Sequence, residues 1–130
     1  MAQIKGTLTN KRYWIATEYV DHYSACSYVY LQQDSSRREK LKRKIAFKHY
    51  ATKQGVTVQS YHADNGQFAD NDFLEDIKAQ RQAITYCRVN AHHQHGKVEK
   101  RIRDLQEKTR VILLHAIHQW PNAITLHLWP

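Results

Sequence analysis

The order of strand-like and helix-like segments is the feature that most constrains how this chain can fold. Runs rich in aromatic and β-branched residues are typical of strands, and runs of good helix formers bounded by capping residues are typical of helices. These criteria predict strands at 12–20, 28–32, 56–63 and 83–89, and helices at 35–54, 70–80 and 97–120. Such an order of elements predicts an α/β fold, with a mixed sheet flanked by helices.

Length and composition predict a single domain that spans residues 1–130. A chain of 130 residues has room for one compact domain, and 42% apolar and 11% aromatic residues are enough to fill a core. The longest aliphatic run, Val111–Leu114, is far shorter than the ~20 residues of a membrane span, and no apolar signal segment follows Met1. We therefore expect an intracellular protein without a membrane partner.

The chain has two cysteines, Cys26 and Cys87, which lie 61 positions apart. Two cysteines do not make a disulfide framework or a four-cysteine zinc module. Cys87 falls in a predicted strand, so we expect it to pack as a small hydrophobic residue rather than to act as a nucleophile.

Basic residues exceed acidic ones, 20 to 12, and the net charge of +8 is unevenly distributed. Residues 35–53 carry eight basic side chains and one acidic one, residues 64–76 carry five acidic side chains and no Lys or Arg, and residues 97–110 carry six basic and three acidic ones. A polyanionic partner explains basic segments on either side of an acidic one, if the acidic side chains hold a cation. The alternative is that these runs are solvated helix faces.

Two acidic residues occupy positions suited to chemistry. Asp64 directly follows the predicted strand 56–63 and begins the sequence Asp-Asn-Gly. Functional sites in such sheets gather at the carboxyl ends of strands, although an Asx-turn is the simpler explanation of this tripeptide. Glu99 lies beside the apolar stripe of the last predicted helix, where it could equally be an exposed residue that pairs with Arg103.

Taken together, three segments resemble the catalytic core of retroviral-type integrases, and specifically that of copia-like LTR retrotransposons. That family has a tyrosine-rich strand that ends in V-D-x-Y-S, then D-N-G, then Q-N-G-x-x-E followed by Arg or Lys. The matching segments are RYWIATEYVDHYSACSYVYL at 12–31, YHADNGQF at 61–68 and VNAHHQHGKVEKRIRDL at 89–105. The resemblance covers almost the whole chain.

The resemblance implies a ribonuclease H-like fold in which three carboxylates bind two divalent metal ions, Mg²⁺ or Mn²⁺. It also implies polynucleotidyl transfer, the joining of element DNA ends to target DNA. Hard oxygen ligands suit these ions, and a pair of metal ions can stabilise both the attacking and the leaving oxygen. By residue, Asp64 matches the second catalytic acid and metal ligand, Glu99 matches the third, and Gln94 matches the loop before the last helix.

The sequence also departs from the family pattern. No Asp or Glu precedes Arg12, so the resemblance implies that the first strand and the first catalytic Asp are missing and that the chain is inactive alone. The interval between Asp64 and Glu99 holds 34 residues, one fewer than is usual in the family, and His95 replaces the usual Asn.

Basic residues are expected to contact DNA, both element ends and target, which places the protein in the nucleus when it acts. Near the acids we expect contacts from Gln94, Lys97, Lys100 and Arg103; peripheral, sequence-independent contacts are expected from Arg37, Arg38, Lys42 and Arg43. A sheet without its first strand exposes edge hydrogen-bonding groups, so a homo-oligomer is a further possibility.

Two other functions stay open at this stage. One is a non-catalytic nucleic-acid-binding or assembly remnant of an integrase, which would bind DNA without metal-dependent chemistry. The other is a nuclease of the same fold, which would release short products without joining them.

Overall fold

The computed structural model describes residues 1–5, 9, 11–63, 68–87 and 96–124. Within them lie five strands and three helices: β1 (Ala2–Lys5), β2 (Ile15–Val20), β3 (Ser27–Gln32), α1 (Arg37–Lys53), β4 (Ser60–Ala63), α2 (Asn71–Ala79), β5 (Ala83–Tyr86) and α3 (Gly96–Gln119). The seven elements predicted from the sequence are present, most of the strands being shorter than predicted. The prediction that the first strand is missing needs correction, because Ala2–Lys5 forms β1 and pairs with β2; β1 carries neither Asp nor Glu.

The described strands form two sheets. β1, β2 and β3 pair antiparallel in that order, whereas β4 and β5 pair parallel. The N-terminal amine of Met1 donates to the carbonyl oxygen of His62 at 2.7 Å and so links the first sheet to β4. Because β4 and β5 are parallel, their carboxyl ends lie at one edge, and Asp64 follows Ala63 in the chain at that edge.

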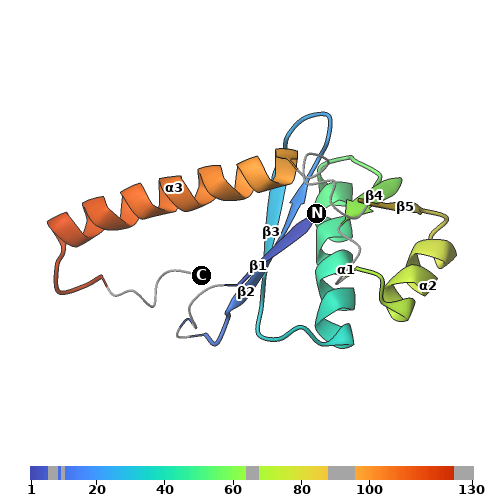
Figure 1. Ribbon diagram of the computed structural model, residues 1–130, viewed down its shortest axis with the longest axis horizontal. Coiled ribbons are helices and arrows are strands. Elements are labelled where there is room, and N and C mark those ends of the chain that lie inside the picture. Colours follow the sequence, from blue (N-terminus) through green and yellow to red (C-terminus); the bar gives the residue numbers. More distant parts are fainter. Residues whose placement is uncertain (6–8, 10, 64–67, 88–95, 125–130) are drawn as a thin grey trace.

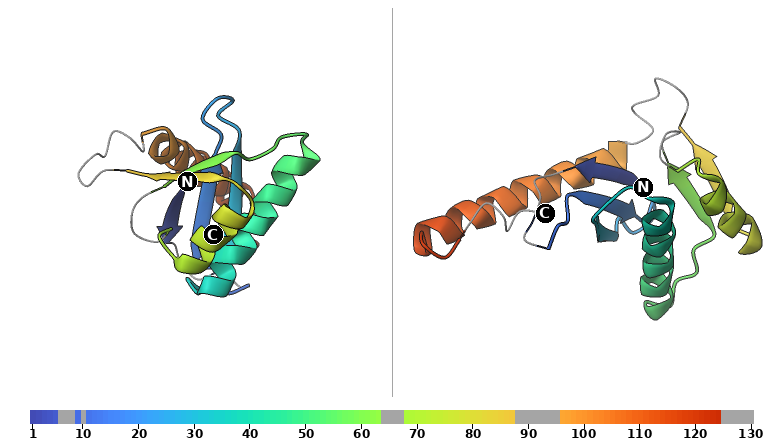
Figure 2. Two further views of the ribbon diagram at one scale, coloured as in Figure 1. Left: turned by 90° about the vertical axis from the view of Figure 1, so that its right-hand side faces the viewer. Right: turned by 90° about the horizontal axis from the view of Figure 1, so that it is seen from below.

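Helices cover both faces of the antiparallel sheet, with α1 on one side and α3 on the other (Figures 1 and 2). Neighbouring residues of β2 point to opposite faces, as in any strand. Tyr19 stacks on Phe47 of α1, with ring centroids 4.3 Å apart, whereas the adjacent Glu18 interacts electrostatically with Arg101 of α3. The arrangement is therefore helix, sheet, helix.

The main core lies between α1, α2 and β4 and is largely aromatic. Tyr19, Tyr61, Phe68 and Phe73 are buried there, and Phe73 makes edge-to-face contacts with both Tyr61 and Phe68. Such contacts between aromatic rings add to the stability that burial of their area provides.

Local signals set the ends of the helices. Ser36 caps α1, and its side chain accepts a hydrogen bond from the amide of Glu39, as the sequence predicts. Gly55, just beyond α1, has φ +75°, which favours glycine at the end of a helix. Asp70 caps α2 in the same way by accepting from the amide of Asp72. None of the helices in the described part of the chain is long and apolar enough to cross a membrane.

The inner face of α1 differs from the prediction. The sequence predicts a packed apolar face and a separate basic face, but the buried residues of α1 are Arg43, Lys44 and Ala51. Ile45, an apolar residue of the same helix, is exposed. Both buried cations have polar partners on neighbouring elements: Arg43 donates to Thr17 of β2 and Gln32 of β3, and Lys44 pairs with Asp76 of α2.

The apolar stripe of α3 also differs from the prediction. It was expected to be buried along the helix, but Val98 is the only residue of α3 that is buried, and Ile112 is 66% exposed. Figure 1 shows the reason: the second half of α3 runs past the edge of the sheet, so nothing in the described part of the chain covers it.

Candidate functional site

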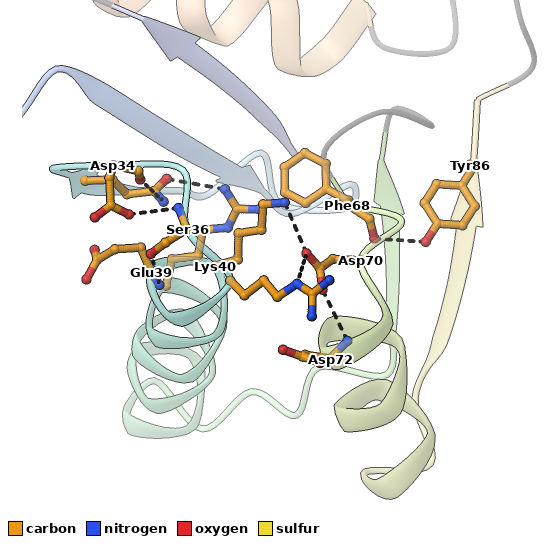
Figure 3. A network of polar contacts seen from close by, with 11 residues as sticks. Asp34, Ser36, Glu39, Lys40, Phe68, Asp70, Asp72 and Tyr86 are labelled. Carbon is orange, nitrogen blue, oxygen red and sulfur yellow. Dashed lines mark hydrogen bonds and ion pairs between the residues drawn. The ribbon is translucent and has the colours of Figure 1, made fainter.

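Asp64 and Gln94 lie outside the described residues. The residues on either side of 64–67 are buried and hydrogen-bonded. Ala63 is fully buried, and its carbonyl oxygen accepts from the amide of Cys87 at 3.0 Å. Phe68 is also fully buried, and its carbonyl oxygen accepts from the hydroxyl of Tyr86 at 3.0 Å (Figure 3). The segment that carries Asp64 thus begins and ends at two points fixed by the strand that pairs with β4.

Glu99 lies in the first turn of α3, with its side chain exposed. Its neighbours anchor this end of the helix to the turn between β2 and β3: the ammonium of Lys97 donates to the carbonyl oxygen of His22 at 2.9 Å, and Nε of Arg101 donates to Oγ of Ser27 at 3.2 Å. Val98 is buried beside them. Glu99 therefore sits at a fixed place on the surface.

The Glu99 carboxylate is available as a metal ligand. The ion pairs within the described residues do not include one between Glu99 and Arg103, the alternative that the sequence left open. A solvent-facing carboxylate supplies the hard oxygen that Mg²⁺ and Mn²⁺ prefer. Across the described ranges, no group of three or more His, Cys, Asp or Glu side chains gathers to hold a metal ion, and Asp64 is not among the residues searched.

The basic residues predicted on α3 differ in their surroundings. Lys100 and Arg103 are exposed on the same stretch of helix as Glu99. The ammonium of Lys97, in contrast, is bound to His22 and holds the helix in place. Lys100 and Arg103 are therefore the better placed of the three to meet a phosphate.

The basic residues predicted on α1 divide in the same way. Arg37, Arg38 and Lys42 are exposed, and Lys42 pairs with Glu39 at 2.6 Å. The prediction that Arg43 contacts DNA needs correction, because this side chain is fully buried. Its Nη1 donates to Oγ1 of Thr17 at 2.9 Å, and its guanidinium lies 4.4 Å from the ring centroid of Phe68.

Acidic residues at the N-cap of α2 and within it pair with three basic side chains of α1. Asp70 Oδ2 lies 3.3 Å from Nζ of Lys40 (Figure 3) and 3.8 Å from Nε of Arg37. Asp76 pairs with the buried Lys44. Much of the alternation of charge along the sequence is therefore satisfied within the molecule. The sequence offered two explanations of the charge runs: a cation held by the acidic side chains, and solvated helix faces. Neither explanation accounts for these ion pairs.

Glu18 is a buried carboxyl that the sequence analysis did not single out as functional. It is 1% exposed, and among the described residues neither carboxyl oxygen has a hydrogen-bond partner. Burial raises the pKa of Glu18, and this rise is opposed by Arg101 and by the N-terminal amine. The signal in the sequence was a single Glu within a strand of apolar and aromatic residues.

Cys87 does not pack simply as a small hydrophobic residue. It is half-buried, directly after β5, and its sulfur lies 3.1 Å from Nε2 of His62. The other ring nitrogen of His62 lies 2.8 Å from the hydroxyl of Thr85, the register partner of His62 across the two strands. Three polar side chains thus line the exposed face of the β4–β5 sheet, just before the position of Asp64 in the chain.

Comparison with known proteins identifies the fold. No protein-family model and no curated protein matches the sequence. Among solved structures, the chain is similar to the HTLV-2 integrase catalytic core domain in complex with magnesium, in its trimeric form. The TM-score is 0.59 and the sequence identity 18%, and the match covers 95% of this chain and 71% of that one. The chain therefore has the α/β fold of a retroviral integrase catalytic core, the ribonuclease H-like fold that the resemblance implies.

Proposed function

We propose that this chain is an integrase core of copia type that acts on DNA, with Asp64 and Glu99 as ligands of divalent metal ions. The observation that carries the proposal is the integrase-core fold, in which Asp64 follows the end of β4 and Glu99 lies exposed in the first turn of α3. The comparison protein was determined with magnesium, which supports Mg²⁺ or Mn²⁺ as the ion.

Divalent ions held by Asp64 and Glu99 would supply activation of an attacking oxygen and stabilisation of the leaving oxygen of a DNA phosphodiester. The residues of the chain bind and position. Lys97 and Arg101 fix the start of α3 against the β2–β3 turn, so that Glu99 is presented at a constant place. Lys100 and Arg103 contact phosphates beside it, together with Gln94, whereas Lys97 acts by holding the helix in place.

Peripheral contacts come from the exposed side chains of Arg37, Arg38 and Lys42, without Arg43. Contacts of this kind add affinity without reading sequence. DNA as the partner implies that the protein works in the nucleus.

The strand β1 carries neither Asp nor Glu, and this supports a second proposal, that this chain has negligible joining activity alone. With two of three carboxylates, a pair of metal ions would lack a bridging ligand. The same observation favours the alternative function, a non-catalytic DNA-binding or assembly module.

The test combines three assays on the full chain: DNA binding over a series of salt concentrations, Mn²⁺ binding by electron paramagnetic resonance, and incubation with DNA ends and Mg²⁺ or Mn²⁺. We expect salt-dependent DNA binding, Mn²⁺ binding weakened by Asp64→Asn and by Glu99→Gln, and no joined product. Glu107→Gln is the matched control, because Glu107 is an exposed acid two turns further along the same helix.

Each other outcome has a clear meaning. If neither variant weakens Mn²⁺ binding and DNA binding persists, the result would favour the non-catalytic DNA-binding module. Joined products that Asp64→Asn abolishes would show that the chain is active alone, and short products without joining would indicate a nuclease. Failure to bind DNA at any salt concentration would contradict both functions.

We also propose that the chain self-associates. Large apolar side chains are exposed in the second half of α3, namely Val111, Ile112 and Leu114, and Trp120 is exposed directly after the helix. Exposed apolar patches on helices are typical of protein interfaces. The trimeric form of the comparison protein supports a second copy of the chain as the partner.

A further inference from the structure

A hollow of about 390 Å³ lies beside β3, the last strand of the antiparallel sheet. Its walls include two tyrosines, Tyr13 and Tyr30, and its polar groups come from Gln33, Glu39 and Lys42. None of these residues belongs to the proposed metal site. The volume falls within the range of small-ligand sites, which is roughly 300–1,000 Å³.

The polar groups of the hollow have a defined arrangement. Glu39 and Lys42 form an ion pair in which the carboxylate side chain is 15% exposed and the lysine side chain 49% exposed, so the acceptor lies deeper than the cation. Gln33 donates from Nε2 to the carbonyl oxygen of Lys11 at 3.1 Å, which orients its amide. Burial and the nearby Glu39 raise the pKa of Tyr30, so its hydroxyl stays protonated.

Positive charge continues outside the hollow. Arg38 is exposed on α1 and precedes Lys42 by four residues, so the two side chains lie on the same face of the helix. A ligand that fits this surface has a flat, polar, uncharged part for the hollow and anionic groups for Arg38 and Lys42.

We propose that the hollow binds one unpaired base of a single-stranded nucleic acid. The base stacks on a tyrosine ring, and its exocyclic amino group donates to Glu39. The flanking phosphates contact Lys42 and Arg38. A base within a duplex is already stacked and paired, so it cannot enter. This inference deepens the proposed binding of DNA and rests on it.

The first test compares the affinity of the full chain for a short single-stranded oligodeoxycytidylate and for a duplex. Tyr30→Val keeps a strand-forming residue in β3 and removes the ring. We expect it to weaken single-strand binding about tenfold, the loss typical of one stacked base, and to leave duplex binding unchanged. Tyr30→Phe retains the ring and should retain the affinity, which separates stacking from the loss of a hydroxyl.

The second test does not depend on a variant that folds. An oligodeoxycytidylate with one 5-iodocytosine, irradiated with the wild-type chain, should form a cross-link to a peptide that contains Tyr13 or Tyr30. Cross-links confined to other peptides would overturn the proposal, and so would equal losses of single-strand and duplex affinity in Tyr30→Val. Duplex binding without any preference for the single strand would show that the hollow is not a base site. It would not contradict the proposed function.

Discussion

Lys44 of α1 and Asp76 of α2 form an ion pair in which the lysine side chain is 1% exposed and the aspartate side chain 30% exposed. The ammonium also lies 5.5 Å from the ring centroid of Tyr61 and 5.3 Å from that of Phe73. The cation is thus held inside the core, while its partner keeps contact with water. The pair joins two helices that are far apart in the sequence.

This asymmetry predicts unequal effects when one partner is removed. Asp76→Asn leaves a buried ammonium without its counter-charge and should lower the free energy of unfolding by about 3 kcal/mol. Lys44→Met keeps the apolar stem against the two rings and leaves a carboxylate that water can reach, so its cost should be smaller. Urea denaturation of the two variants measures the difference. Equal losses, or a larger loss in Lys44→Met, would contradict the asymmetry.

Sequence reasoning could place the elements because their signals are local. Ser36 and Gly55 mark the ends of α1 within a few residues of the helix itself. The burial of Lys44 could not be predicted in this way, because it depends on Asp76, which lies 32 positions further along the chain. A basic helix face buried against acids has the same periodicity as a basic face in solvent.

The same limit applies to the candidate site. The spacing of Asp64 and Glu99 was visible in the sequence, and the exposure of Glu99 agrees with it. That Arg43 is buried whereas Arg38 and Lys42 are exposed was not visible, because it depends on how α1 packs on β2 and β3. Likewise, an apolar stripe on a helix predicts a covered face, but it does not show that α3 runs past the edge of the sheet before Ile112.

Glu18 predicts a dependence of stability on pH. Because burial raises the pKa of Glu18 in the folded state, the folded chain holds this proton more tightly than the unfolded chain. The stability that this group contributes is present below its unfolded pKa and is lost as the pH rises through its folded pKa. Glu18→Gln cannot ionise, so at pH 7 its free energy of unfolding should be higher than that of the wild type.

The measurement is chemical denaturation of the wild type and Glu18→Gln from acid to neutral pH. The difference in stability should grow in favour of the variant as the pH rises. Glu107→Gln, which changes an exposed acid, should show no such trend. A difference that stays constant with pH would show that the ionisation of Glu18 does not limit stability.

The division of basic residues on α1 predicts different effects on DNA binding. Neutralising the exposed pair with Arg38→Gln and Lys42→Gln should weaken DNA binding and reduce the slope of log affinity against log salt by roughly two. The control is Lys53→Gln with Lys78→Gln, which removes the same charge from exposed positions elsewhere. An equal change in slope for both pairs would indicate a response to net charge alone.

Arg43 should behave differently from that pair. Arg43→Met removes the hydrogen bond to Thr17 and the cation above the Phe68 ring, so it should lower the free energy of unfolding by about 2 kcal/mol. At temperatures where the variant is folded, its salt slope for DNA should match that of the wild type. A reduced slope would place Arg43 at the DNA surface.

The second half of α3 predicts concentration-dependent self-association. Ile112 and Trp120 are 66% and 63% exposed, and a second copy of the chain would remove both from water. Ile112→Lys should weaken self-association at least about tenfold, since it places a charge in an apolar contact, and should change the stability of the monomer by less than about 0.5 kcal/mol. Sedimentation velocity over a series of concentrations measures the first, and urea denaturation the second. Gln106→Lys adds the same charge at an exposed position one and a half turns earlier and should leave self-association unchanged. An equal effect of both substitutions, or a wild type that stays monomeric, would contradict this role of α3.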